Sequence, residues 1–227
     1  MKVLAFDTGA AACAVAVLDE ARVVERQRPM ARGHAEALLP LILEVLGEAA
    51  LSFTDLDLLA VTVGPGAFTG LRVGLAAARG LRLSSGLPCL GVPTLEALAA
   101  TARRQTACTT PLLAVLDTGR GDVYAQRFAA DGAPAGEAVA AALVDLPALV
   151  QPSGVCVAGD AAETVTAVLR AAGIPAGSLV IATPSAAVVA ARALERWQAG
   201  ERDLSPPAPL YLRAPLTGPR LATAAAR

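Results

Sequence analysis

Aromatic residues are scarce in this sequence, at 3% of 227 residues. Apolar residues still make up 55% of the chain and charged residues only 17%, which is typical of a folded globular protein rather than a disordered one. The core must therefore be built mainly from Leu, Val and Ala. The length allows one large or two small domains, each with a proper core.

A surplus of positive charge is also missing, because the formal net charge is −1. Proteins that bind nucleic acid unaided usually carry a basic surplus, since neutralising phosphates supplies much of the affinity. Any contact of this chain with nucleic acid is therefore expected to be indirect or shared with a partner.

Histidine occurs once, as His34. A single histidine excludes metal sites that need two of them, and it leaves only one candidate base for a Ser-His-Asp triad. The Gly-x-Ser-x-Gly motif of such hydrolases is absent. We therefore expect no metal site, and we expect His34, together with Glu36, to cap the first turn of a helix.

Paired cysteines and long apolar runs are missing as well. The four cysteines, Cys13, Cys89, Cys108 and Cys156, form no Cys-x-x-Cys pair, which favours free thiols in a reducing compartment over disulfides or zinc. No stretch approaches the roughly 18 apolar residues of a membrane span, and the apolar start at residues 1–6 is too short for a signal peptide. We therefore expect a cytoplasmic protein without membrane contact.

The spacing of the apolar residues alternates between strand-like and helical patterns. It predicts strands at 3–6, 13–18, 22–28, 58–63 and 88–92, with helices at 34–50, from 70 to about 83, and at 94–103. After a polar break at 103–106, strands are predicted at 112–116, 123–128, 133–139, 155–158 and 180–181, with helices at 161–172 and 185–198. We therefore predict an N-terminal domain at 1–106, a C-terminal domain at 107–203 and an irregular, proline-containing tail at 204–227.

One pattern occurs twice. Residues 4–9 (LAFDTG) and 114–119 (AVLDTG) each form an apolar strand that ends in Asp-Thr-Gly and is followed by a second strand. Asp-Thr-Gly is a common turn, so the repeat of the tripeptide alone could be coincidence. The matching flanking strands favour a duplicated α/β domain.

Two loops could hold an anion. Asp7, Thr8 and Gly9 end the first strand, and glycine lets backbone N–H groups approach a phosphate, but the Ala10–Ala12 turn that follows offers only backbone to hold it. The loop from Gly64 to Gly70, with Gly66 and Thr69, lies between a strand and a helix, where N–H groups can also face an anion. The alternative is a tight turn with Thr69 as the helix N-cap, which we favour on physical grounds.

The two helices of the first half are apolar on more than one face. This predicts either helices buried within the core or a surface that binds another protein, and for the 34–50 helix we favour the interface. The candidate interface residues are Leu38, Leu39, Ile42, Val45 and Leu46 in the first helix and Gly70, Leu71, Gly74, Leu75 and Ala78 in the second. For Arg72, Arg79 and Arg82 of the second helix we favour a solvated face over a nucleic-acid contact.

Five segments together resemble the TsaB (YeaZ) family of tRNA threonylcarbamoyladenosine biosynthesis proteins. They are Leu4-Ala-Phe-Asp-Thr8, His34-Ala-Glu-Ala-Leu-Leu-Pro40, Gly64-Pro-Gly-Ala-Phe-Thr-Gly-Leu-Arg72, Gly91-Val-Pro-Thr-Leu-Glu96 and Pro209-Leu-Tyr-Leu-Arg213. The third is highly specific and the others support it. They depart from the usual family pattern at Gly9, Ala35 and Ala67, where the family commonly has serine; the loss of these hydroxyls argues further against nucleotide chemistry.

The resemblance implies a duplicated actin-like (ASKHA, ribonuclease H-like) α/β fold, with two domains of mixed sheets flanked by helices. It also implies a non-catalytic scaffold that binds a TsaD-like catalytic subunit through the N-terminal helices and can self-associate through a similar surface. A TsaE-like ATPase would join the pair. Contact with tRNA would be indirect, with no cofactor in the isolated chain and nucleotide only at a site shared with partners. Asp7, Thr8, Gly9, Gly64, Gly66 and Thr69 would then be a vestigial anion site.

Three other interpretations remain open. The chain could be an active actin-like, ATP-dependent small-molecule kinase, against which the bare Ala10–Ala12 turn argues. It could be a metallopeptidase, which a single histidine makes unfavourable. It could also be a homodimeric binding module without a role in tRNA modification.

Overall fold

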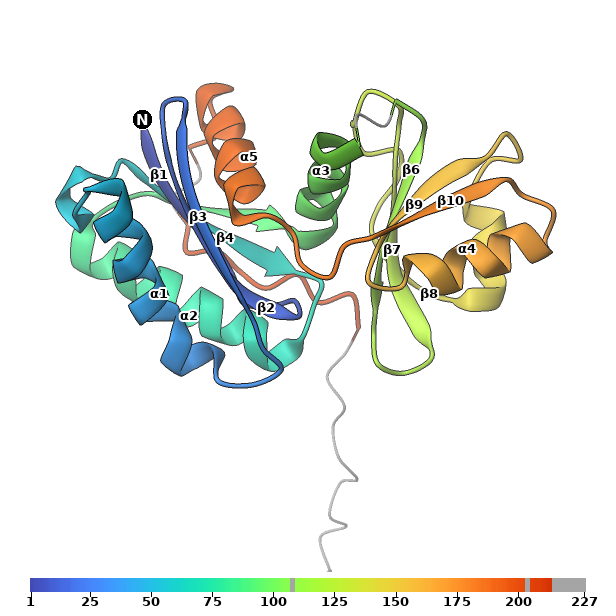
Figure 1. Ribbon diagram of the computed structural model, residues 1–227, viewed down its shortest axis with the longest axis horizontal. Helices are drawn as coiled ribbons and strands as arrows, with labels where there is room; N and C mark the ends of the chain where they lie inside the picture. The colour runs from blue at the N-terminus through green and yellow to red at the C-terminus, as the bar shows by residue number, and fades with distance from the viewer. Residues whose placement is uncertain (107–108, 203–204, 214–227) are drawn as a thin grey trace, which may run out of the picture.

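The computed structural model describes residues 1–106, 109–202 and 205–213, so Cys108 and most of the predicted tail, 214–227, lie outside the described residues. The described chain forms two lobes, each built on one sheet (Figure 1). The first sheet contains β1 (Lys2–Asp7), β2 (Ala12–Asp19), β3 (Arg22–Pro29), β4 (Leu58–Gly64) and β5 (Cys89–Pro93), in the order β3-β2-β1-β4-β5.

The second sheet repeats this plan. It contains β6 (Leu112–Asp117), β7 (Asp122–Phe128), β8 (Val139–Ala142), β9 (Val155–Gly159) and β10 (Ala176–Val180), in the order β10-β9-β6-β7-β8. In each sheet the first strand pairs antiparallel with the second and parallel with the fourth, so β1 corresponds to β6 and β4 to β9. The prediction of a duplicated fold with two mixed sheets is confirmed.

Helices cover both faces of each sheet. In the first lobe, α1 (His34–Ala49) and α2 (Phe68–Ser85) lie on the outer face, while α5 (Ala186–Gln198) lies on the inner face. In the second lobe, α4 (Ala162–Ala171) and a 3-10 helix (Leu143–Leu149) cover the outer face, and α3 (Thr94–Thr106) the inner one. A shorter 3-10 helix, Phe53–Asp55, precedes β4; neither 3-10 helix was predicted.

The two inner helices are exchanged between the halves of the sequence. α3 belongs to the first half, yet Leu95 and Leu98 pack with Leu112 and Phe128 of the second sheet. α5 comes from the second half, yet its apolar face packs against the first sheet, with Val189 in one cluster with Val3, Ala5 and Leu58. The boundary predicted at residue 106 separates the strands of the two sheets, but burial of these apolar faces places each inner helix on the other lobe.

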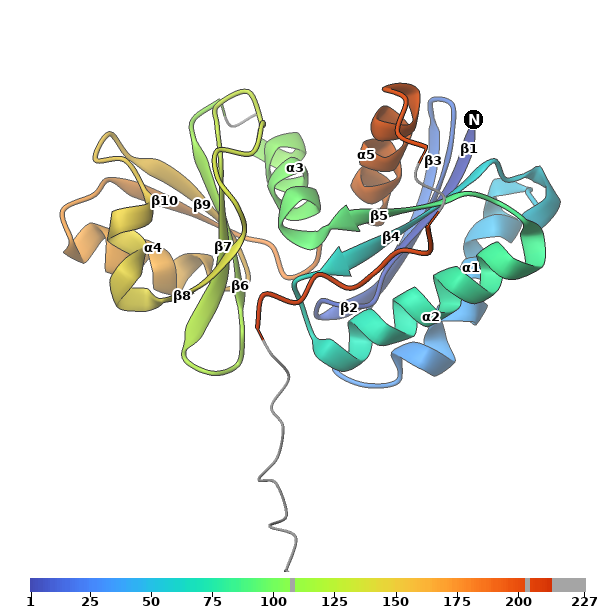
Figure 2. The same cartoon turned by 180° about the vertical axis from the view of Figure 1, so that it is seen from behind.

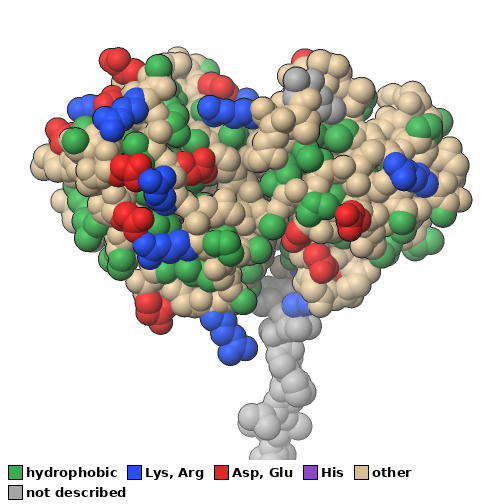
Figure 3. Space-filling view, in the orientation of Figure 1, with side chains coloured by type: hydrophobic (Ala, Val, Ile, Leu, Met, Phe, Trp, Pro, Cys, Tyr) green, Lys and Arg blue, Asp and Glu red, His purple; other side chains and the backbone are tan. Residues whose placement is uncertain are grey.

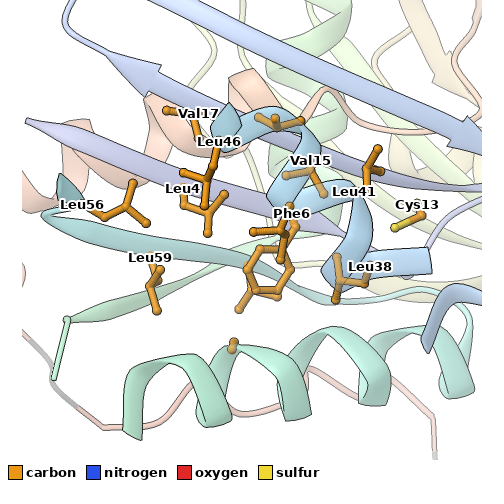
Figure 4. Packing of buried hydrophobic residues seen from close by; sticks show 14 of the residues in the cluster. Leu4, Phe6, Cys13, Val15, Val17, Leu38, Leu41, Leu46, Leu56 and Leu59 are labelled. Carbon is orange, nitrogen blue, oxygen red and sulfur yellow. The ribbon is translucent and has the colours of Figure 1, made fainter. Parts of the chain in front are cut away.

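The core of the first lobe lies between the sheet and helix α1. Leu4 and Phe6 of β1 and Leu38 and Leu41 of α1 are at most 1% exposed, and their side chains face one another in Figure 4. Burying a leucine side chain contributes about 1.5–3 kcal/mol, so this layer is a main source of stability for the lobe.

One predicted strand is displaced. The pattern predicted a strand at 133–139, but β8 begins at Val139. Before it, the N–H of Ala135 donates to the carbonyl of Arg127 at 2.8 Å, within a short irregular segment. Pro134 has no N–H for a regular ladder, and this proline interrupts the predicted strand.

Candidate functional site

The two predicted anion-binding loops lie against each other at the carboxyl ends of β1 and β4. The hydroxyl of Thr8 donates to the carbonyl of Gly70 at 2.7 Å, and the N–H of Ala67 donates to the carbonyl of Gly9 at 2.8 Å. The structure therefore brings Asp7, Thr8 and Gly9 together with the loop of Gly64, Gly66 and Thr69. Thr69 is not the N-cap of α2, because the helix begins at Phe68 and Ala67 occupies the cap position without a side-chain hydrogen bond.

Glycines allow these loops to touch backbone to backbone. A Cβ atom at Gly70 would lie 1.9 Å from the carbonyl oxygen of Thr8, and one at Gly66 would lie 2.6 Å from that of Gly9. No side chain fits at such distances without moving the backbone. The glycines of this loop thus serve close packing of the two turns.

Asp7 occupies the centre of this contact and is fully buried. Its carboxylate accepts hydrogen bonds from the N–H of Gly9 at 3.3 Å and of Ala10 at 3.2 Å, and from the hydroxyl of Thr62. Burial raises the pKa of Asp7 above its usual range, although these hydrogen bonds act in the opposite direction. The amide donors that a phosphate would need are therefore already used inside the protein.

The matching turn of the second lobe is more open. Asp117, Gly119 and Arg120 are exposed, and the carboxylate of Asp117 accepts from the N–H of Gly119 at 2.9 Å. The carboxylate of Asp160, at the end of β9, accepts from the N–H of Asp117 at 2.8 Å. Burial is the main cause that raises the pKa of Asp160, and the neighbouring Asp117 charge adds to it. Sequence reasoning missed Asp160, although its place directly after a buried strand was the available signal.

The predicted interface residues are mostly buried in the chain's own core. Leu38, Ile42, Val45 and Leu46 are at most 3% exposed, and Gly70, Leu71, Gly74, Leu75 and Ala78 are buried in α2. Only Leu39, at 50% exposure, faces outward. The prediction that the other nine residues form an exposed surface is wrong, because they belong to the stripes, spaced three and four residues apart, that each helix buries against its own lobe.

Other apolar side chains of these two helices are exposed. Leu39 and Leu43 are one turn apart on α1 and half or more exposed, and Phe68 and Leu83 of α2 are 40% and 87% exposed. Phe68 packs against Tyr211 of the same chain, so we refer to Leu39, Leu43 and Leu83 as the outer apolar residues.

A hollow of about 1080 Å³ opens beside Phe68, between the start of α1 and the start of α2. His34 lines it, and its Nε2 atom is buried without a hydrogen-bond partner among the described residues. The predicted cap is not formed, because Gly33 occupies the N-cap position at a φ of 89°, with no side-chain hydrogen bond. Glycine adopts this left-handed conformation without strain.

Residues 1–106, 109–202 and 205–213 contain no group of three or more His, Cys, Asp or Glu side chains placed to hold a metal ion. Among the same residues, no helix is long and apolar enough to cross a membrane.

The buried thiols give a direct test of the first lobe's packing. Burial and the nearby Asp7 raise the pKa of Cys13 to about 11, and burial raises that of Cys89 to about 12. Since the thiolate is the reactive form, we expect iodoacetamide at pH 8 to label both at least about 100-fold more slowly than in the unfolded chain, as measured by peptide mass spectrometry. Cys156 is partly exposed and serves as the internal control, with faster labelling. Labelling of Cys13 at the unfolded rate would contradict this packing.

Comparison with known proteins gives a consistent result. A sequence model of the family TsaD, tRNA N6-adenosine threonylcarbamoyltransferase, matches residues 23–192. The protein TsaB of tRNA threonylcarbamoyladenosine biosynthesis from Escherichia coli K12 is 37% identical over 58% of this chain and 56% of its own length. The protein of the same name from Haemophilus influenzae is 34% identical over 55% of this chain and 52% of its own length. The matches thus span little more than half the length of these curated relatives.

Solved structures agree over more of the chain. YeaZ from Pseudomonas aeruginosa superimposes with a TM-score of 0.80 and 28% identity, over 93% of this chain and 99% of that one. A ROK hexokinase from Thermus thermophilus superimposes with a TM-score of 0.55 and 14% identity over 86% of this chain and 99% of its own, which shows a common actin-like fold and no more. From the family model and these relatives we conclude that the chain belongs to the TsaB (YeaZ) proteins of the TsaD family.

Proposed function

We propose that this chain is a non-catalytic scaffold subunit of the assembly that forms threonylcarbamoyladenosine beside the anticodon of ANN-decoding tRNAs. It binds a TsaD-like catalytic subunit and, with it, a TsaE-like ATPase. Nucleotide binds only at a site shared with these partners. The family membership supports the pathway, and the closed geometry around Asp7 supports the absence of catalysis.

The main support for a non-catalytic role is that the turn after β1 has no free N–H groups facing a phosphate position at Gly9 and Ala10. In a phosphate-binding turn, backbone N–H groups point at the anion. Here the N–H groups of Gly9 and Ala10 point at the Asp7 carboxylate, and the carbonyl of Gly9 is in contact with the neighbouring loop. A phosphate at this position would meet a carboxylate instead of free donors. Hydrolysis of ATP by the isolated chain would contradict the proposal.

The outer apolar residues are the best candidates for the partner surface. Exposed leucines one turn apart are costly to leave in water and are typical of the central part of interfaces. Two ion pairs link helix α1 to strand β3: Glu48 pairs with Arg26, and Glu44 pairs with Arg28. The exposed leucines of α1 therefore have charged groups beside them on the same helix. The same surface would support self-association in the absence of the partner.

Contact with tRNA is proposed to be indirect. On the face shown in Figure 3, Lys and Arg side chains are interleaved with Asp and Glu over the first lobe, and the second lobe shows few charges. Interleaved charges do not create the positive field that attracts nucleic acid. The catalytic partner would then supply most of the tRNA affinity.

A charge placed in the outer apolar residues tests the proposed interface. We expect Leu43→Glu to weaken binding to the TsaD-like subunit at least about 30-fold, the size of an interface hot spot, with an unchanged Tm. Modification of tRNA by the reconstituted proteins should fall in parallel. Binding is measured by calorimetry and modification by nucleoside mass spectrometry.

The matched control is Val144→Glu. Val144 is 80% exposed in the second lobe, far from α1 in the fold, and receives the same new charge. We expect the Val144→Glu variant to bind the TsaD-like subunit as tightly as the unchanged chain does. Equal behaviour of the two variants would show that the outer apolar residues are not the partner surface.

A further inference from the structure

Residues 205–213 run along the first lobe and end beside the turn between β6 and β7 (Figure 2). They form no helix or strand, and we refer to residues 207–213 as the strap. Pro207 is buried, and Leu210, Leu212 and Arg213 are half-buried, so the strap is packed although it has no regular structure.

The first half of the strap is fixed to the first lobe. The N–H of Leu210 donates to the carbonyl of Val63 at the end of β4, at 2.7 Å, and Arg79 of α2 donates to the carbonyl of Pro207 at 3.0 Å. The approach at Gly64 is so close that a Cβ atom there would lie 2.9 Å from the carbonyl oxygen of Leu210. This glycine thus makes room for the backbone of the strap.

Aromatic and cationic groups hold the middle of the strap. The ring of Tyr211 lies 5.4 Å from that of Phe68, and the hydroxyl of Tyr211 accepts from Nε of Arg72 at 3.2 Å. The guanidinium of Arg72 also lies over the Phe68 ring, 3.7 Å from its centre. Arg72 and Arg79 are exposed, as expected for a solvated face, and both also donate hydrogen bonds to the strap.

The last residue of the strap reaches the second lobe. Arg213 forms an ion pair with Asp122 at the start of β7, whose side chain is 10% exposed. A cavity of about 250 Å³ lies between the lobes at this point, and its walls come from the 65–71 segment at the start of α2, from Arg120 and Tyr124, and from the strap itself. The strap therefore contacts both lobes at their facing turns.

We infer that the groove between Val63–Phe68 of the first lobe and Arg120–Tyr124 of the second is a peptide-binding site, and that the chain's own strap is its occupant. Its ligand is an extended peptide with the pattern Pro-x-Pro-Leu-Tyr-x-Arg, fixed by a backbone hydrogen bond, an aromatic contact and a terminal ion pair. Prolines suit this use, because their restricted φ lowers the entropy lost on binding. While seated, the strap ties the two lobes together at their facing turns.

A peptide added to the full chain tests the site. The probe is a fluorescein-labelled peptide of residues 205–213, and binding is followed by fluorescence anisotropy. In the unchanged chain, the tethered strap competes at an effective concentration on the order of millimolar, so the peptide should bind weakly. In the double variant Leu210→Asp, Arg213→Glu the strap loses the leucine side chain that packs on the first-lobe core and the ion pair to Asp122. We expect the peptide to bind this variant at least about 10-fold more tightly than the unchanged chain.

Two controls separate specific binding of the peptide from nonspecific binding. The chain variant Ala208→Glu adds a charge at an exposed strap position and should bind the peptide as weakly as the unchanged chain. A peptide carrying Tyr211→Ala and Arg213→Glu should not bind the double variant. If the folded double variant binds the unchanged peptide no better than the unchanged chain does, the inference is wrong.

Hydrogen exchange decides the matter if the double variant does not fold. In the single variant Arg213→Glu, the Leu210 amide should exchange at least about 10-fold faster than in Ala208→Glu, because loss of the ion pair frees the strap end. Residues 120–124 should also exchange faster. Equal exchange in both variants would overturn the inference.

Discussion

Replacing Gly70 with alanine should destabilise the protein by at least about 4 kcal/mol, which corresponds to a fall in Tm of about 10–15 °C for a chain of this size. The new Cβ atom would lie 1.9 Å from the carbonyl oxygen of Thr8, and backbone on both sides leaves nothing flexible to yield. Either α2 or the β1–β2 turn must move, and either movement breaks the Thr8–Gly70 hydrogen bond. Urea unfolding followed by circular dichroism measures the effect.

Gly80→Ala is the matched control for this prediction. Gly80 lies in the same helix, is exposed, and has no atom within 4 Å of its would-be Cβ. Alanine favours helix over glycine by about 0.5–1 kcal/mol, so this variant should be slightly more stable than the unchanged chain. If Gly70→Ala were as stable as Gly80→Ala, the backbone contact between the two turns would not exist in solution.

The second large effect is a difference in stability between glutamate substitutions at two neighbouring leucines of α1. Leu38 is 1% exposed and Leu39 is 50% exposed. Glutamate at 38 would place a carboxylate between β1, β2 and the helix without a partner, and we expect a loss of more than about 4 kcal/mol and no folded monomer. Glutamate at 39 would face water, and its Tm should stay within about 2 °C of that of the unchanged chain.

Thermal unfolding and size-exclusion chromatography of the two variants measure this difference. Leu38→Met tests the site without charge, because methionine conserves volume and should cost less than about 1.5 kcal/mol. A stable, monomeric Leu38→Glu variant would mean that α1 packs differently, and it would restore Leu38 as a candidate for the partner surface.

Local patterns predicted most of the elements, because strand and helix periods follow from local geometry. The two Asp-Thr-Gly turns also predicted the duplication, since matching strands flank both copies. The exchange of α3 and α5 was not predictable in this way. Each helix carries an apolar face with the correct period, but the period does not say which sheet covers that face.

The errors at the candidate site have a similar cause. The spacing of Leu38, Ile42 and Val45 fits both a core stripe and an interface stripe, and only burial distinguishes them. Asp160 and Thr62 were missed because their role depends on strands far apart in sequence that meet in the fold. The strap was predicted as irregular, but its partners on both lobes could not be read from a segment with so little periodicity.

The exchanged inner helices make the two halves of the sequence dependent on each other. A fragment ending at residue 106 would keep α3, whose Leu95 and Leu98 would lack the second sheet, and it would expose the face of β1 and β4 that α5 covers. The fragment from residue 107 onward would carry α5 without the first sheet, and its own sheet would lack the cover of α3. Separately produced halves should therefore aggregate, whereas halves produced together should combine, so that the ancestral repeat survives as one cooperative unit instead of two independent ones.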